Sequence, residues 1–317
     1  MTIETGGTAQ KAVMPPLTFR RGIAVWDWPT IGLFTVCVGL WGLALMSAAA
    51  WPVTAFVVLV LTLVLHSSLA HEILHGHPFG SQRAGTLLGI VQLGLAIPFL
   101  RFKRLHLAHH VDARLTDPYD DPETNYQDPE IWAGLARWQR AVLLFNNTLA
   151  GRMLVGPVVS QWSFMRSDAR LIRGGDRQVL NDWLLHLPGV ALVLWLVAVS
   201  PMDVPTYLLA CYAATSILKI RTFLEHRAHD HSSARTVVVE DRGPLAFLFL
   251  NNNYHIVHHM HPAVPWYRLP SLYAAHKERY LTRNQGYVYR SYRQVFAQYF
   301  WRSKDTVPHP LWQGRGE

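Results

Sequence analysis

The chemistry of this sequence is concentrated in its histidines. There are 17 of them among 317 residues, and most fall in short clusters. Three clusters, here called boxes one, two and three, are His71-Glu-Ile-Leu-His75, His106-Leu-Ala-His109-His110 and His255-Ile-Val-His258-His259. A fourth cluster runs from Glu225 to His231. Side chains three or four positions apart share one face of a helix, so each box can direct its imidazoles at a metal.

The number of imidazoles indicates more than one ion. Eight box histidines exceed the three or four ligands that a zinc ion needs. The two cysteines, Cys37 and Cys211, lie in apolar runs, which argues against iron–sulfur clusters and thiolate zinc sites. The simplest interpretation is two ions that share the clustered imidazoles. Imidazole binds iron, copper, nickel and zinc, so the ligand type alone does not choose the metal.

The elements that must position these boxes are strongly apolar. Half of the residues are hydrophobic and only 16% are charged, against about 25% in a typical soluble domain. The runs from Ile31 to Ala50 and from Pro52 to Ala70 contain no charged residue. The length of each run approaches the roughly 20 apolar residues that a helix needs to cross a bilayer. Trp51-Pro52 between them is a tight turn, which predicts a hairpin.

A second pair of apolar runs follows later in the chain, from Trp183 to Ser200 and from Val204 to Ile220. The sequence therefore predicts an all-α integral membrane protein with four transmembrane helices in two hairpins. Three other apolar stretches are predicted to be interfacial or re-entrant segments that cover the site. They are Ala84 to Leu100, Ala141 to Trp162 and Leu245 to Leu250. For the first of these, the alternative is a fifth spanning helix.

The basic residues predict the orientation. The net charge is +8, yet neither hairpin turn carries any of the 29 Lys and Arg residues. By the positive-inside rule, both termini and the large loop between the hairpins face the cytoplasm. The boxes then meet in a cytoplasmic histidine-rich cap, and we expect residence in a bacterial inner membrane. No basic, aromatic-laced soluble module is present, which argues against nucleic acid as a partner.

These patterns divide the chain into three parts. Residues 1–25 are predicted to be a disordered N-terminal tail, residues 26–285 a membrane domain, and residues 286–317 a C-terminal cytoplasmic tail.

Boxes of this kind between two membrane hairpins resemble the integral-membrane fatty acid desaturase and hydroxylase superfamily. The resemblance runs from about Trp26 to Tyr280. His71-Glu-Ile-Leu-His75-Gly resembles the first box of the family, and Arg221-Thr-Phe-Leu-Glu-His226-Arg resembles the stretch where the family places an extra ligand histidine. The text from Asn253 to Pro270, with its Pro-rich end, resembles the third box of bacterial desaturases.

The resemblance implies a centre of two iron ions held by histidines, with O2 as co-substrate. It also implies a lipid or acyl substrate and an external electron donor, such as ferredoxin and its reductase, because no redox domain is fused. The family sometimes completes one iron with an Asn or a water one turn before the extra histidine, where this chain has Thr222. The implied metal ligands are His71, His75, His106, His109, His110, His226, His255, His258 and His259.

Other polar residues near the boxes have open roles. His229, His231 and His261 are not required by the family pattern. Carboxylates close to the boxes are candidates to accept hydrogen bonds from the outer imidazole nitrogens. These candidates are Asp112, Asp117, Glu225 and Asp230.

The sequence indicates the family more clearly than it indicates the reaction. The favoured function is introduction of a double bond into a fatty acyl chain by a di-iron oxidoreductase, and the alternative is a hydroxylase or carotenoid ketolase of the same superfamily. A more distant alternative is a zinc intramembrane protease, because His71-Glu72-Ile-Leu-His75 is a literal HExxH with Glu72 as general base. A metal or haem transporter is the non-enzyme alternative, although transporters place their ligands near the bilayer midplane.

Overall fold

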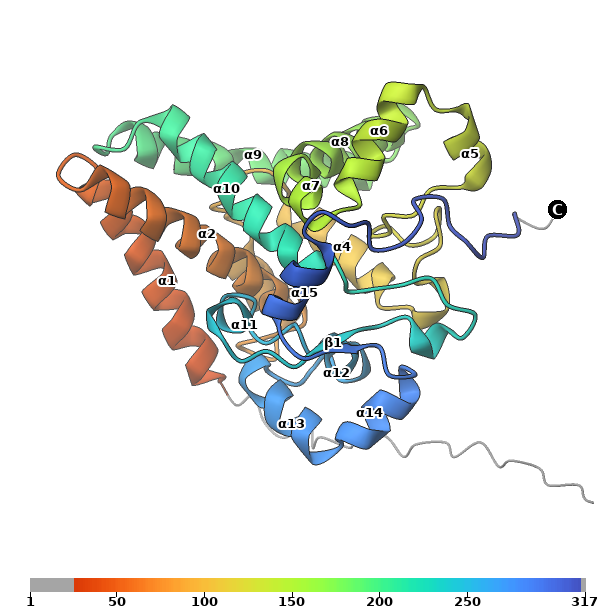
Figure 1. Cartoon of the computed structure of the whole chain (residues 1–317). Coiled ribbons are helices and arrows are strands. Elements are labelled where there is room, and N and C mark those ends of the chain that lie inside the picture. Colours follow the sequence, from red (N-terminus) through yellow and green to blue (C-terminus); the bar gives the residue numbers. More distant parts are fainter. Residues whose placement is uncertain (1–25, 315–317) are drawn as a thin grey trace, which may run out of the picture.

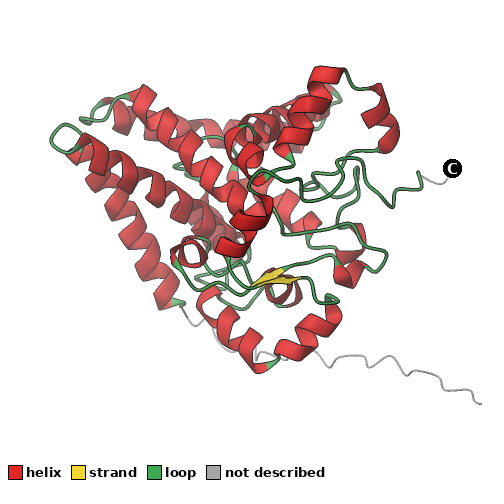
Figure 2. Cartoon of the chain, in the orientation of Figure 1, coloured by secondary structure: helices red, strands yellow, loops and turns green. Residues whose placement is uncertain are grey.

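The computed structural model describes residues 26–314 and is mostly helical. Figures 1 and 2 show long helices at one side of the molecule and short helices with loops at the other. The predicted N-terminal tail, residues 1–25, lies outside the described residues.

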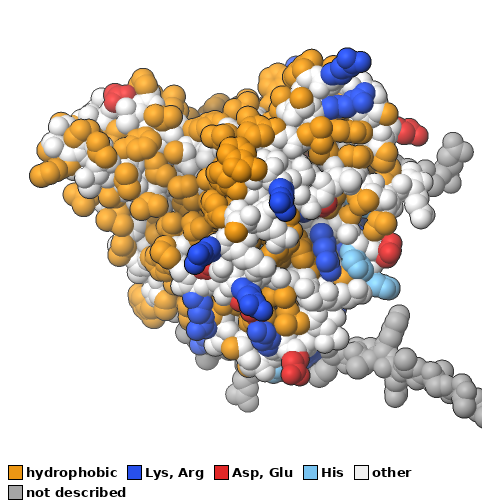
Figure 3. Space-filling model, viewed as in Figure 1, with side chains coloured by type: hydrophobic (Ala, Val, Ile, Leu, Met, Phe, Trp, Pro, Cys, Tyr) orange, Lys and Arg blue, Asp and Glu red, His pale blue; other side chains and the backbone are white. Residues whose placement is uncertain are grey.

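Three helices are long and apolar enough to cross a membrane: α1 (Trp28–Ser47), α2 (Pro52–Leu74) and α9 (Arg177–Ala198). The Asp27 side chain caps α1 by accepting a hydrogen bond from the Thr30 backbone N–H, and Pro52 opens α2. A short turn joins α1 to α2, and the two helices pack against each other. Their outer faces expose large apolar side chains, among them Met46 and Val53 (Figure 3).

The fourth predicted span is present as helix α10 (Val204–Thr222), which packs against α2. Its last turn carries Lys219 and Arg221, and it falls short of the hydropathy of the other three. Three candidate spans are therefore found, and a fourth stays a prediction. The α1–α2 and α9–α10 turns lie at the same end of the molecule, upper left in Figure 1. Figure 3 shows no Lys or Arg at that end on the face in view.

The segment from Ala84 to Leu100 is not a spanning helix. Helix α3 (Gln82–Gly89) is short, residues 90–98 are irregular, and α4 (Phe99–His109) begins beyond them. Side chains of the long helices satisfy the irregular backbone: Tyr207 donates to the Leu93 carbonyl at 2.7 Å, and His186 bonds the Leu95 carbonyl at 2.8 Å. The alternative of a fifth spanning helix here is therefore wrong, because the segment turns back on the bundle.

Four helices follow α4 and lead to the second long pair. They are α5 (Pro129–Gly134), α6 (Arg137–Asn146), α7 (Leu149–Leu154) and α8 (Gly156–Arg173). The apolar stretch from Ala141 to Trp162 is thus divided among α6, α7 and α8. Helix α7 packs against α10, and α8 packs against both α9 and α10.

The C-terminal third adds α11 (Pro244–Leu248), α12 (His255–Met260), α13 (Leu269–Ala275), α14 (Lys277–Arg283) and α15 (Tyr292–Tyr299). It also contains a small parallel pair of strands, β1 (Val238–Val239) and β2 (Val288–Tyr289), which the all-α expectation did not include. Residues 286–314, predicted to begin a tail, contribute Tyr287, Tyr292 and Val295 to the main core. The division of the chain at residue 285 stays a prediction.

Candidate metal centre

Box one and box two sit at the ends of helices that meet. His71 lies in the last turn of α2, and His75 is the C-cap of that helix. His106 and His109 lie in the last turn of α4, and His110 is its C-cap. Box three forms most of α12, a single short helix that begins at His255. Three helix segments distant in the sequence therefore bring their imidazoles to one place.

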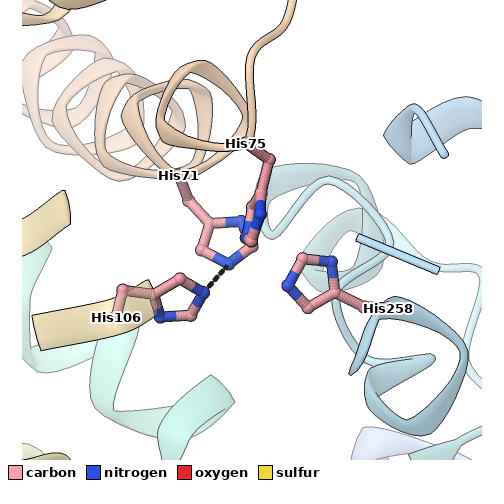
Figure 4. A group of neighbouring side chains, drawn as sticks. All are labelled: His71, His75, His106 and His258. Carbon is pink, nitrogen blue, oxygen red and sulfur yellow. Dashed lines mark hydrogen bonds between the residues drawn. The ribbon is translucent and has the colours of Figure 1, made fainter. Parts of the chain in front are cut away.

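One group of imidazoles forms where α2, α4 and α12 converge. Each of four residues offers one ring nitrogen, and these four nitrogens all lie within 4.8 Å of one another: His71, His75, His106 and His258. Figure 4 shows the four rings turned toward a common centre, with Nε2 of His71 and Nε2 of His106 3.0 Å apart. Among the described residues, Nε2 of His75 is buried without a hydrogen-bond partner. An unpartnered buried nitrogen costs free energy, and a bound cation removes that cost.

A second group forms beside the first. Four further residues each offer one ring nitrogen within 4.8 Å of the others: His109, His226, His255 and His259. Nε2 of His226 is 2.9 Å from Nε2 of His109 and 3.1 Å from Nε2 of His255. These residues, here called the four-histidine group, include the histidine that lies outside the three boxes.

His110 belongs by distance to the first group. Its Nε2 lies 2.9 Å from Nε2 of His106 and 3.1 Å from Nε2 of His258. Its ring stacks on that of His259, with centroids 4.2 Å apart, so it stands between the two groups. The five-histidine group is therefore His71, His75, His106, His110 and His258. All nine histidines expected as ligands are brought together, and their ligation stays a prediction.

His226 is positioned by an extended segment and not by a helix. Helix α10 ends at Thr222, and His226 lies in an extended segment bridged to Thr236. Its Nδ1 is 3.3 Å from the Thr236 hydroxyl, and its carbonyl accepts from the Lys304 ammonium. The C-terminal segment that carries Lys304 therefore helps to hold this histidine in place.

The spacing of the nitrogens fits metal ions. Two nitrogens bound at about 2.1 Å to one ion lie about 3.0 Å apart as adjacent ligands and about 4.2 Å apart as opposite ones. The close Nε2 pairs, at 2.9 to 3.1 Å, have the separation of adjacent ligands. A donor set made of imidazoles suits iron, as it suits zinc or copper. The residues present therefore fit two ions, one in each group.

Two carboxylates from the loop after box two fix the imidazoles from outside. Glu123 Oε1 lies 2.9 Å from Nδ1 of His106, and Asp121 Oδ1 lies 2.7 Å from Nδ1 of His109. Each carboxylate accepts a hydrogen bond from Nδ1–H, which leaves Nε2 with a lone pair that faces its group. Asn252 Oδ1 does the same for His255 at 3.1 Å.

These partners are not the ones expected from the sequence. Asp117 accepts instead from backbone N–H groups of its own turn, at Tyr119 and Asp120. Asp230 is exposed, and the Asp112 side chain lies outside what the structure describes. Glu225 is buried beside Arg221, 3.1 Å away, and its Oε1 is 3.8 Å from Nδ1 of His255. The available signal was the Asp-Pro-Glu sequence at 121–123, close behind box two.

The electrostatics favour neutral, metal-binding imidazoles. Burial, together with neighbouring imidazoles, holds the pKa of His75, His226, His255 and His258 well below the usual value. His109 is the exception: burial lowers its pKa, but the Glu123 and Asp121 carboxylates outweigh this and raise it to about 9. A bound cation competes with that proton, so metal binding at His109 releases it.

Box two is held in place by buried ion pairs. Arg101 on α4 donates from Nε and an Nη atom to the Asp168 carboxylate on α8, at 2.9 and 2.6 Å. The Trp183 indole on α9 donates to the same carboxylate at 2.9 Å. Arg104 pairs with Asp182 on α9. These contacts fix α4, which supplies histidines to both groups, against the long helices.

The remaining candidates lie elsewhere. Glu72 is buried and accepts a hydrogen bond from the Trp266 backbone N–H at 3.1 Å, so it ties α2 to the loop after box three. That contact does not support its role as a general base.

The rings of His229 and His231 contact each other, and the His261 ring contacts Tyr280. Two cavities of about 190 and 230 Å³ are lined by residues of α8 and α9 and by residues near α13, away from the histidine boxes.

Comparison with known proteins places this arrangement in a family. The profile of the family described as fatty acid desaturase matches residues 46–292. This chain belongs to the fatty acid desaturase family. It is therefore an enzyme of the membrane desaturase and hydroxylase superfamily, whose members are di-iron oxygenases. The predicted resemblance is confirmed.

Two curated relatives of this desaturase-family chain have a more specific name. The beta-carotene ketolase of Paracoccus sp. (strain N81106 / MBIC 01143) is 29% identical over 237 residues, covering 71% of this chain and 82% of the relative. The beta-carotene ketolase of Paracoccus sp. (strain PC1) is 27% identical over 259 residues, covering 77% and 86%.

Proposed function

We propose that this protein is a membrane di-iron oxygenase that inserts oxygen into a carotenoid and forms a ketone. The observation that carries the proposal is the similarity to two beta-carotene ketolases over most of their lengths. The five-histidine and four-histidine groups would each hold one iron, and a pair of irons held there would supply the O2-dependent oxidation of a C–H bond. The nine imidazoles would hold the metals. Glu123 and Asp121 keep the Nε2 lone pairs of His106 and His109 turned toward the two groups.

The chemistry requires two rounds at one carbon. In the first, a CH2 group, one O2, two electrons and two protons give CH(OH) and one water. In the second, CH(OH), one O2, two electrons and two protons give C=O and two waters. In this proposal an external one-electron carrier, such as ferredoxin with its reductase, supplies the electrons.

The second candidate is desaturation of a fatty acyl chain, which the sequence favoured. The family description supports it, and the reaction needs the same metals, O2 and electrons. Both substrates are long apolar chains, which suits the exposed apolar faces of α1, α2 and α9 (Figure 3). The HExxH protease is disfavoured because His71 and His75 join seven further imidazoles and Glu72 is engaged elsewhere.

The two reactions are separated by product analysis in one host. Bacterial cells that make β-carotene are given the wild-type protein or the His258→Ala variant, and both pigments and fatty acids are extracted. We expect the wild type alone to yield carotenoids with the mass change of CH2 replaced by C=O. New double bonds in the fatty acids with unchanged pigment would overturn the ketolase proposal and favour the second candidate.

We also propose that both termini and the metal groups face the cytoplasm and that α10 is a fourth span. The α1–α2 and α9–α10 turns carry no Lys or Arg and lie together (Figure 1). Reporter fusions after Trp51 and after Met202 are expected to lie across the membrane from a C-terminal reporter. A C-terminal reporter on the outer side would contradict this orientation.

A further inference from the structure

The two histidine groups are unequal in a way that points to a missing ligand. The five-histidine group has five imidazoles, and the other group has four. All nine expected ligands are imidazole nitrogens. A further ligand from the chain would have to lie on the side of the four-histidine group where these nitrogens face one another. That side is marked by the Nε2 atoms of His109, His226 and His255, which face one another at 2.9 and 3.1 Å.

Glu123 reaches that side. Its Oε1 lies 2.9 Å from Nδ1 of His106, on the outer side of the five-histidine group. Its Oε2 lies 3.9 Å from Nε2 of His109, the nitrogen that faces His226. Two atoms bound at about 2.1 Å to one ion lie between about 3.0 and 4.2 Å apart. The separation of 3.9 Å lies within that range, so Glu123 Oε2 and Nε2 of His109 can bind one ion together.

The loop holds Glu123 in register with His109. Asp121 Oδ1 accepts both from Nδ1 of His109 at 2.7 Å and from the Glu123 backbone N–H at 2.9 Å. Asp121 Oδ2 accepts from the Thr116 backbone N–H at 2.8 Å. A single buried carboxylate thus fixes the imidazole and the backbone of the glutamate two residues later, so their relative position is set by the fold.

Other polar groups near the four-histidine group face its outside. Glu225 and Asn252 approach Nδ1 of His255, not the Nε2 that faces His226, and Glu225 is paired with Arg221. The Thr236 hydroxyl approaches Nδ1 of His226. Glu123 is thus the carboxylate that the structure places against a metal-facing nitrogen of this group.

We propose that Glu123 is a carboxylate ligand of the metal in the four-histidine group. The inference rests on the proposed metal centre. The Oε1 atom of Glu123 accepts a hydrogen bond from Nδ1–H of His106, so this one side chain connects the two groups. A carboxylate also brings a negative charge to a site otherwise made of neutral imidazoles, which strengthens binding of a cation.

The test is iron binding and spectroscopy on full-length protein in detergent. The Glu123→Gln variant keeps the shape and an acceptor for His106 but lacks the charge, and Glu130→Gln on the surface helix α5 is the control. After loading with isotopically enriched iron and dialysis against a chelator, we expect wild type and control to keep two irons. We expect Glu123→Gln to keep about one, losing the Mössbauer component that His226→Ala also loses.

Two irons with an unchanged spectrum in Glu123→Gln would overturn the inference and leave the proposed centre intact. A wild-type protein that binds no iron would overturn the proposed centre itself. If Glu123→Gln does not fold, Glu123→Asp decides, because it keeps the carboxylate but withdraws it by one methylene. In that variant the component of the four-histidine group must change, and an unchanged component would overturn the inference.

Discussion

Boxes two and three use the same spacing in opposite ways. In box two, the first and last histidines, His106 and His110, join the five-histidine group, and His109 joins the other. In box three, His255 and His259 join the four-histidine group, and His258 joins the first. Each helix therefore serves both groups, and a shared helical face does not mean a shared ion.

The groups differ in how they are supported. The five-histidine group takes two members from the end of α2, a long helix that is buried at this end. The four-histidine group takes His226 from an extended segment, held by a bridge to Thr236 and by Lys304. The four-histidine group therefore depends more on loop segments than the five-histidine group does, so we expect it to release its metal more easily.

The largest effect is expected from His258→Ala. His258 lies against His110, His71 and His75, so its loss opens the centre of the five-histidine group. Product formation should fall to background, and the retained iron should fall to one or fewer per chain. His276→Ala, an exposed position between α13 and α14, should leave both unchanged. Normal turnover in His258→Ala would show that the reaction does not require the five-histidine group.

His226→Ala should cost the second group its iron and leave the first group loaded. His226 faces both His109 and His255, so no neighbouring imidazole replaces it. The matched control is His229→Ala, three residues along, whose ring contacts His231 outside both groups. Metal analysis after dialysis should give about one iron for His226→Ala and two for His229→Ala. The reverse result would show that His229 is the ligand.

A smaller effect is expected from Asp121→Asn. The amide can still accept from His109 but carries no charge, and replacing outer partners of ligating histidines commonly costs about 10–100-fold in metal affinity. We expect that loss for the iron of the four-histidine group alone, measured by competition with a chelator. An equal loss from both groups would contradict the assignment of Asp121 to one group.

Asp168→Asn should weaken the protein without distinguishing the groups. It breaks the buried pair with Arg101 that fixes α4, which supplies both groups. Breaking such a pair typically costs about 3–5 kcal/mol of folding free energy. Thermal unfolding in detergent should shift downward, and the two irons should be lost together. Loss of one iron before the other would show that α4 is anchored differently for each group.

The sequence predicted the parts that depend on local pattern. Apolar runs located α1, α2, α9 and α10, and the spacing of the histidines placed the boxes on helices. It did not predict which group each histidine joins, because that depends on how α4 and α12 face each other. It missed Asp121 and Glu123 because a loop carboxylate has no periodic pattern. The packing of residues 286–314 was missed because a short parallel strand pair and one short helix leave a weak signal.

Nine histidines form two groups in one chain, and we expect each group to bind its own metal ion. Iron analysis of purified wild-type protein, followed by timed release to a chelator, tests it most directly. We expect two irons per chain that leave in two phases, and only the faster phase should be missing in His226→Ala. One ion per chain, with His226→Ala unchanged, would contradict it.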